Sequence, residues 1–126
     1  MNAKQLNPAA LAFVGDAVYG LLVRERLSSI SRPSGELHRL SVKLVSAAAQ
    51  VKAFKLIESN LSEEEQEIFR RGRNFHTNST PKSVSVAEYH IATGLEVLFG
   101  YLHMSGEHTR KNELFSIIWN DFEHKI

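Results

Sequence analysis

Cysteine is absent from this chain of 126 residues. Its absence excludes a disulfide scaffold, a thiolate metal site and a cysteine nucleophile. Long hydrophobic runs are missing as well, since no stretch approaches the roughly 20 apolar residues that a membrane-spanning helix needs. The residues that follow Met1 contain no apolar run of the kind found in secretory signals. We therefore expect a cytoplasmic protein with no membrane partner.

An excess of one charge sign is also lacking, because 15 Lys and Arg stand against 14 Asp and Glu. The charges instead alternate in blocks, with five Glu between Glu58 and Glu67 and four basic residues between Arg70 and Lys82. A further basic block contains Arg39, Lys43, Lys52 and Lys55. Such a block is usually a solvated helix face, although two basic blocks can also form a patch that holds phosphates. For the block that begins at Arg39, both interpretations stay open.

Proline is scarce, and each of the three prolines lies at a predicted helix boundary. Between these boundaries the apolar residues recur with helical spacing, and no strand-like alternation of useful length appears. The pattern predicts helices over residues 9–27, 34–60 (with a break near 45–46), 63–72, 85–104 and 107–122. We therefore expect one all-α domain of five to seven helices that covers residues 1–126.

Two of these helices carry a single acidic residue in otherwise apolar surroundings. Asp16 is the only charged residue between Pro8 and Val23, and Glu96 is the only acid between Tyr89 and Met104. A helix that is apolar nearly all round is expected to be buried, and an ionised carboxylate there is costly unless it is paired or binds a cation.

Either acid alone could simply pair with an arginine. If Asp16 and Glu96 face one another, however, they form a site of hard oxygen ligands that suits Mg²⁺. Together with the basic blocks, such a site favours metal-dependent hydrolysis of phosphodiesters.

These acidic segments resemble the two metal-binding helices of the ribonuclease III family. The first is Leu11-Ala12-Phe13-Val14-Gly15-Asp16-Ala17-Val18, and the second is Leu95-Glu96-Val97-Leu98-Phe99-Gly100-Tyr101-Leu102. The segments 69–74 and 80–82, with Tyr89 ahead of residues 92–93, are similar to Mini-ribonuclease III. This is the short bacterial branch of the family that lacks a double-stranded-RNA-binding domain. The resemblance covers about residues 7 to 118.

The resemblance implies a ribonuclease III-like endonuclease domain that works as a homodimer. Each subunit would contribute one Mg²⁺-dependent centre, with Asp16 and Glu96 as its catalytic metal ligands. Duplex RNA would lie between the subunits and be cut to 5′-phosphate and 3′-hydroxyl ends. The branch matures the ends of precursor 23S ribosomal RNA, so a ribosomal protein is a candidate partner. Phe13 matches a position at the family's subunit interface, although core packing is the alternative.

This sequence departs from the wider family at two acidic positions. Ala12 stands where the family has Glu, and Thr93 stands where it has Asp. The short branch shares both departures. With two carboxylates per centre, we expect weaker metal affinity and more of the coordination left to water and phosphate.

The end of the third predicted helix and the loop after it are the expected RNA-binding region. Cations are favourable at any helix C-terminus, but three arginines followed by polar residues suit contacts to phosphates and 2′-hydroxyls better. A family histidine in the second helix could also touch phosphate or merely hold its turn. The expected RNA-binding residues are Arg70, Arg71, Arg73, Asn74, His76, Lys82 and His38.

Two other functions fit the same fold. One is a non-catalytic duplex-RNA-binding or ribosome-assembly factor, which the two missing acids favour. The other is a helical protein–protein adaptor. The presence of Asp16 and Glu96 in apolar helices argues against the first, because a protein without catalysis has no need to keep carboxylates there. The absence of any RNA affinity at low salt would favour the second.

Overall fold

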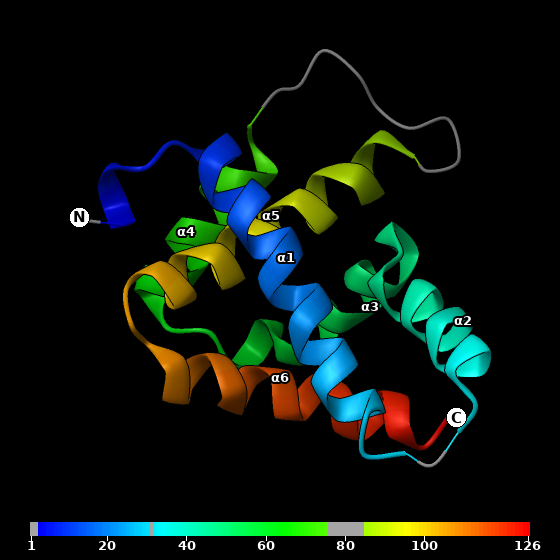
Figure 1. The fold of residues 1–126 in the computed structure, drawn as a ribbon. Coiled ribbons are helices and arrows are strands. Elements are labelled where there is room, and N and C mark those ends of the chain that lie inside the picture. The colour runs from blue at the N-terminus through cyan, green and yellow to red at the C-terminus, as the bar shows by residue number, and fades with distance from the viewer. Residues whose placement is uncertain (1–2, 31, 76–84) are drawn as a thin grey trace.

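The computed structural model of the chain describes residues 3–30, 32–75 and 85–126 (Figure 1). In these ranges the protein is all-α, as predicted, with six α-helices, two short 3₁₀-helices and no strand. The elements are η1 (Ala3–Gln5), α1 (Pro8–Leu27), α2 (Ser34–Val45), α3 (Ala47–Ile57), η2 (Glu58–Asn60), α4 (Glu63–Arg73), α5 (Val86–Met104) and α6 (His108–Glu123). None of these helices combines the length and hydropathy of a membrane span.

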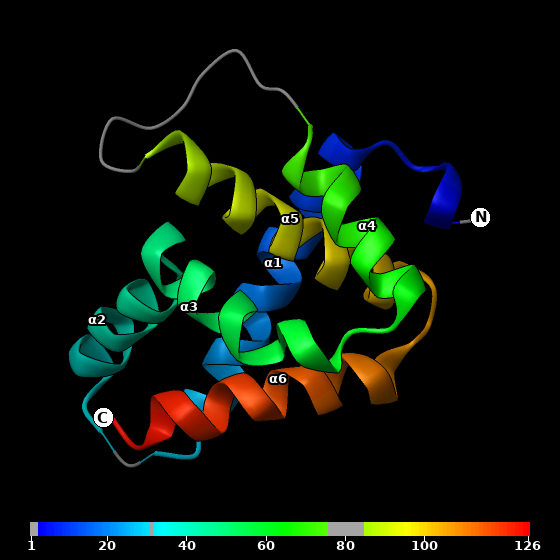
Figure 2. The same cartoon turned by 180° about the vertical axis from the view of Figure 1, so that it is seen from behind.

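Helix α5 lies in the middle of the fold and packs against α1, α3, α4 and α6 (Figures 1 and 2). Every residue from Ala92 to Leu102 except Glu96 is buried, which confirms the prediction that this apolar helix is internal. The predicted break in the second helix is also confirmed, because Ser46 ends α2 and caps α3 by accepting a hydrogen bond from the Ala49 amide at 3.2 Å. The surroundings of Glu96 are therefore set by α5 and the helices that cover it.

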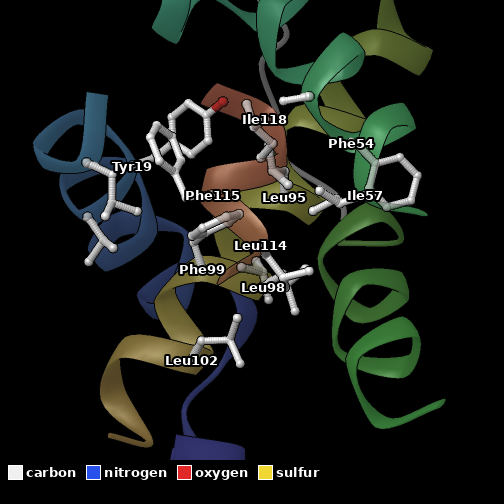
Figure 3. Packing of buried hydrophobic residues seen from close by; sticks show 14 of the residues in the cluster. Tyr19, Phe54, Ile57, Leu95, Leu98, Phe99, Leu102, Leu114, Phe115 and Ile118 are labelled. Atoms are coloured by element: carbon white, nitrogen blue, oxygen red, sulfur yellow. The ribbon is translucent and has the colours of Figure 1, made fainter. Parts of the chain in front are cut away.

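Aromatic rings fill the space between α1, α5 and α6 (Figure 3). The Tyr19 ring meets Phe99 and Phe115 edge to face, with 5.5 Å between centroids in both pairs. Edge-to-face contacts favour the ring quadrupoles in addition to the apolar area that they bury. This packing fixes the rotation of α1 and α5 about their axes, and with it the direction of the side chains on their other faces.

Two glycines let α1 and α5 cross with their backbones in contact. A Cβ atom on Gly15 would lie 1.7 Å from the carbonyl oxygen of Glu96, and one on Gly100 would lie 2.1 Å from that of Leu11. No side chain other than hydrogen fits at either position. Because Asp16 follows Gly15 directly, the crossing brings it beside Glu96.

The expectation that α1 is buried all round is wrong. One side of α1 packs against α5 and the neighbouring helices, but Phe13, Asp16, Ala17 and Leu21 are exposed. Among the described residues, no element covers that side, so an apolar residue there is either solvated or meets another molecule. Asp16 is therefore accessible, whereas Glu96 is partly buried.

Candidate active site

Asp16 and Glu96 line one open cavity of about 470 Å³, so the fold brings together the two acids that stand on separate helices. The cavity is bounded by α1, α5, the end of α2 and the start of α3. Its remaining lining residues are Val45, Ser46, Ala47, Ala48, Gln50, Tyr89, Ala92 and Thr93. The cavity is open to solvent on the side of Asp16, which gives a large anion access to the carboxylates.

The electrostatics of the cavity favour a cation. The pKa of Glu96 is raised to about 8. Burial is the largest cause, and the negative charge of Asp16 and a hydrogen bond with Asp16 act in the same direction. A hydrogen bond from the Gln50 side chain acts in the opposite direction and lowers the pKa. Without a cation, Glu96 therefore retains its proton at neutral pH, and a divalent cation would replace that proton.

The donor set of the cavity fits Mg²⁺. The described residues contain no group of three or more His, Cys, Asp or Glu side chains that could hold a metal ion. At the two positions where the family has further acids, Ala12 offers no oxygen and Thr93 uses its hydroxyl to donate to the Tyr89 carbonyl at 2.9 Å. Mg²⁺ is commonly held by one or two carboxylates, several waters and substrate phosphates, and two carboxylates are what Asp16 and Glu96 supply.

Gln50 is the residue in this cavity that sequence reasoning missed. It lies in α3 with 3 % of its surface exposed, and its Nε2 donates to the Val45 carbonyl at 3.1 Å. An uncharged residue carries no periodic signal of its own. The signal that could have identified it is a long amide side chain among small apolar residues in a helix next to a predicted bend.

The arginines of α4 differ in their surroundings. Arg70 and Arg73 are exposed and border a cavity of about 370 Å³ between α4 and the end of α3. Asn74 is also exposed and accepts a hydrogen bond from Arg73 Nε at 3.3 Å. Arg71 is half-buried and donates to the Leu6 carbonyl at 3.3 Å. Arg71 thus holds the segment before α1 in addition to any role that it has toward RNA.

The other predicted RNA contacts are only partly described. His38 is exposed on α2, whereas His76 and Lys82 lie outside the described residues. In the second basic block, Lys43 and Lys52 border a cavity of about 440 Å³ together with Arg32 and Lys125. That arrangement suits an anion, but it is also what a solvated basic face looks like, and both interpretations stay open.

An apolar strip runs along the exposed side of α1. Phe13 is 82 % exposed and Leu21 is 57 % exposed, and Ala17 lies between them at helical spacing on the same face. Core packing of Phe13 within its own subunit is therefore excluded. Asp16 borders this strip, so a molecule that covered the strip would also come close to the carboxylates.

Comparison with known proteins identifies the family. Residues 9–107 match the model of the ribonuclease III domain. A Mini-ribonuclease 3 from Thermoanaerobacter sp. (strain X514) is 46 % identical over 113 residues, which are 89 % of this chain and 80 % of that protein. A Mini-ribonuclease 3 from Clostridium tetani is 37 % identical over 124 residues, which are 97 % and 82 % of the two chains.

A solved structure agrees with the sequence matches. A protein from Fusobacterium nucleatum superposes with a TM-score of 0.80 at 28 % identity, over 97 % of this chain and 96 % of that chain. The family model covers most of the chain, and both relatives exceed 30 % identity over most of its length. The chain therefore belongs to the ribonuclease III family, whose members cut double-stranded RNA, and it is an endoribonuclease.

Proposed function

We propose that this endoribonuclease hydrolyses double-stranded RNA with Mg²⁺ bound by Asp16 and Glu96. The observation that carries the proposal is the pair of carboxylates on one open cavity, together with the rise of the Glu96 pKa to about 8. A carboxyl that keeps its proton at neutral pH beside a second acid contributes no ion pair to the fold, but the two oxygen ligands suit a cation. The non-catalytic alternatives give this arrangement no purpose.

The chain's own residues divide the work at this centre. Asp16 is exposed and can meet an ion that arrives together with a phosphate, whereas Glu96 is partly buried on α5 and anchors the inner side. When bound, Mg²⁺ supplies charge neutralisation on the phosphate and lowers the pKa of water. Hydrolysis would join a water oxygen to phosphorus and break the bond from phosphorus to the 3′ oxygen, so that one product carries a 5′-phosphate and the other a 3′-hydroxyl.

The basic residues at the end of α4 would grip the RNA. Arg70, Arg73 and Asn74 are exposed in one place and present donors that suit phosphates and 2′-hydroxyls. The same role is proposed for Arg71, His76, Lys82 and His38. Contacts of this kind read the shape of a duplex more than its sequence.

We further propose that the chain acts as a homodimer, in which the strip of Phe13, Ala17 and Leu21 is covered by the second subunit. Support comes from the exposure of Phe13 and Leu21 next to Asp16, since large apolar side chains grouped on a surface mark interaction sites. Residues 1–126 would then be one catalytic domain per subunit. The cytoplasm, where RNA is processed, is the proposed location.

For the natural substrate we propose the duplex stem formed by the two ends of precursor 23S ribosomal RNA, with a ribosomal protein as a candidate partner. The support is the resemblance to the short branch of the family. Incubating the chain with that stem and with a random duplex of equal length tests it. Faster cutting at fixed positions in the stem is expected, and equal rates on both duplexes would overturn this part of the proposal.

Cleavage of a long RNA duplex tests the proposed activity itself. The wild-type chain, Asp16→Asn and Glu96→Gln are each incubated with the duplex in MgCl₂ and in EDTA. We expect cutting by the wild type in MgCl₂ alone, and a loss of at least about 100-fold in either variant, because each removes one of two charged ligands. Circular dichroism checks that the variants retain their helices.

Binding of the same duplex is measured in parallel, in CaCl₂ to prevent cutting. Binding without cutting by the wild type would favour the non-catalytic RNA-binding factor. The absence of binding at low salt would favour the adaptor instead. Wild-type cleavage rates in Asp16→Asn would remove Asp16 from the centre.

A further inference from the structure

Gln50 lines the carboxylate cavity and has an unsatisfied oxygen. Its Oε1 atom is buried and accepts no hydrogen bond from the described residues. The orientation of the amide is fixed, because the Val45 carbonyl can only accept and the amide nitrogen must therefore face it at 3.1 Å. A buried oxygen without a donor is unusual in a native fold and points to a missing water or ion.

Helix capping alone does not account for the burial of this amide. Gln66 occupies the equivalent position in α4 and makes the same bond, from Nε2 to the carbonyl five residues earlier, at 3.1 Å from Leu61. Gln66 is exposed, so its oxygen is free to meet water. Gln50 makes the same bond but is enclosed at the wall that it shares with Asp16 and Glu96. The comparison separates the capping bond, which both glutamines make, from the burial, which only Gln50 has.

The Gln50 side chain also acts on Glu96, because it lowers the pKa of that carboxyl. A lowered pKa is the effect of an amide N–H directed at a carboxylate. Nε2 carries two hydrogens, which is enough for the Val45 carbonyl and for Glu96. Gln50 is therefore held by the end of α2 on the cavity that it shares with Glu96, and its oxygen has no described partner.

We propose that Gln50 is a third member of the metal site: its amide nitrogen positions Glu96, and its Oε1 accepts a hydrogen bond from the water shell of the bound Mg²⁺. The inference rests on the proposed function, because it assumes that Asp16 and Glu96 hold the ion. The inference adds a neutral oxygen to a site that has only two carboxylates. With so few charged ligands, each further oxygen acceptor is expected to contribute more to metal affinity. Residues that orient ligands and hold metal-bound water commonly change affinity when they are replaced.

Thermal unfolding of the RNA-free protein across a series of MgCl₂ concentrations tests the proposal without using activity. The concentration that gives half of the maximal rise in Tm reports metal affinity, because the ion stabilises the folded state by mass action. For Gln50→Met, which keeps the length of the side chain and removes both polar atoms, we expect this concentration to rise about tenfold. Gln50→Glu keeps an oxygen acceptor and adds charge, so its half-saturation is expected at or below that of the wild type.

Gln66→Met is the matched control, because it loses the same capping bond outside the cavity. We expect it to lower Tm in the absence of metal and to leave half-saturation unchanged. Two results would overturn the proposal and leave Gln50 as a helix cap. One is a half-saturating MgCl₂ concentration of Gln50→Met equal to that of the wild type. The other is a loss of metal affinity in Gln50→Glu as large as that in Gln50→Met. If Gln50→Met does not fold, Gln50→Asn takes its place, since it withdraws the amide by one methylene.

Asp16→Asn distinguishes this failure from failure of the proposed function. If Asp16→Asn raises half-saturation and Gln50→Met does not, only the role of Gln50 is wrong. If Asp16→Asn also saturates at the wild-type concentration, the carboxylate pair does not hold the ion, and the proposed function fails with it.

Discussion

At the scale of residues, the chemistry rests on two acids that the sequence makes conspicuous and on a glutamine that it does not. Asp16 and Glu96 could be predicted because a lone charge in an apolar helix costs free energy unless it has a purpose. Gln50 could not be predicted, since an uncharged residue on α3 gives no sign of which cavity it borders. The bond from Arg71 to the Leu6 carbonyl was equally hidden, because it depends on the path of the chain between η1 and α1.

The raised pKa of Glu96 predicts how stability changes with pH in EDTA. Between about pH 4.5, the ordinary value, and about pH 8, the folded chain holds a proton on Glu96 that the unfolded chain has released. Stability therefore falls as the pH rises through this window. For Glu96→Gln, which cannot ionise, we expect stability equal to the wild type near pH 5 and greater by about 1 to 3 kcal/mol at pH 8.

Urea denaturation of both proteins at pH 5, 6, 7 and 8 measures this difference. Addition of Mg²⁺ should reverse the order at pH 8, because only the wild type gains the full stabilisation by the ion. Parallel pH profiles in EDTA would show that Glu96 ionises normally and that no strain is stored in the pair.

At the scale of elements, the site depends on how closely α1 and α5 cross. Helix positions could be predicted well from spacing, capping residues and the bend at Ser46, because these signals are local. The exposed side of α1 could not, since an apolar residue looks the same in a sequence whether it faces a core or a partner. The closeness of the crossing is indicated by Gly15 and Gly100 only once their neighbours in space are known.

Gly15→Ala tests this crossing. The added Cβ would lie 1.7 Å from a backbone oxygen, which no rotamer change can relieve. The helices must separate, so we expect a loss of about 3 kcal/mol of stability or more, and loss of cleavage because Asp16 and Glu96 move apart.

Gly35→Ala is its control, since Gly35 lies in α2 with no neighbouring atom within 4 Å of the added Cβ. Alanine favours a helix over glycine by up to about 1 kcal/mol, so unchanged or slightly higher stability and full activity are expected. Urea denaturation and duplex cleavage measure both variants. A Gly15→Ala variant as stable and active as Gly35→Ala would show that the crossing is not tight.

At the scale of the whole molecule, one subunit leaves an apolar strip beside its own active centre. The 82 % exposed phenylalanine beside Asp16 is costly in a monomer, and burial of a Phe side chain contributes about 1.5 to 3 kcal/mol. The position of Phe13 at an interface could be expected from the family resemblance alone. Its exposure gives that expectation a physical basis.

Phe13→Glu is expected to convert the proposed dimer to a monomer, because it places a charge in the apolar strip. Sedimentation velocity at micromolar concentrations measures the change. Val42→Glu is the matched control, since Val42 is 53 % exposed and belongs to α2 rather than to the strip on α1, and it should sediment as the wild type does. A monomeric wild type, or a dimer that survives Phe13→Glu, would contradict the assignment of this face.

The most direct measurement of the central claim is an anomalous difference map from a crystal grown or soaked with MnCl₂, which stands in for Mg²⁺ and scatters anomalously. We expect one strong peak per subunit between the carboxylates of Asp16 and Glu96, and none there in crystals of Asp16→Asn. The absence of a peak between the two acids at saturating Mn²⁺, or an equal peak in Asp16→Asn, would contradict it.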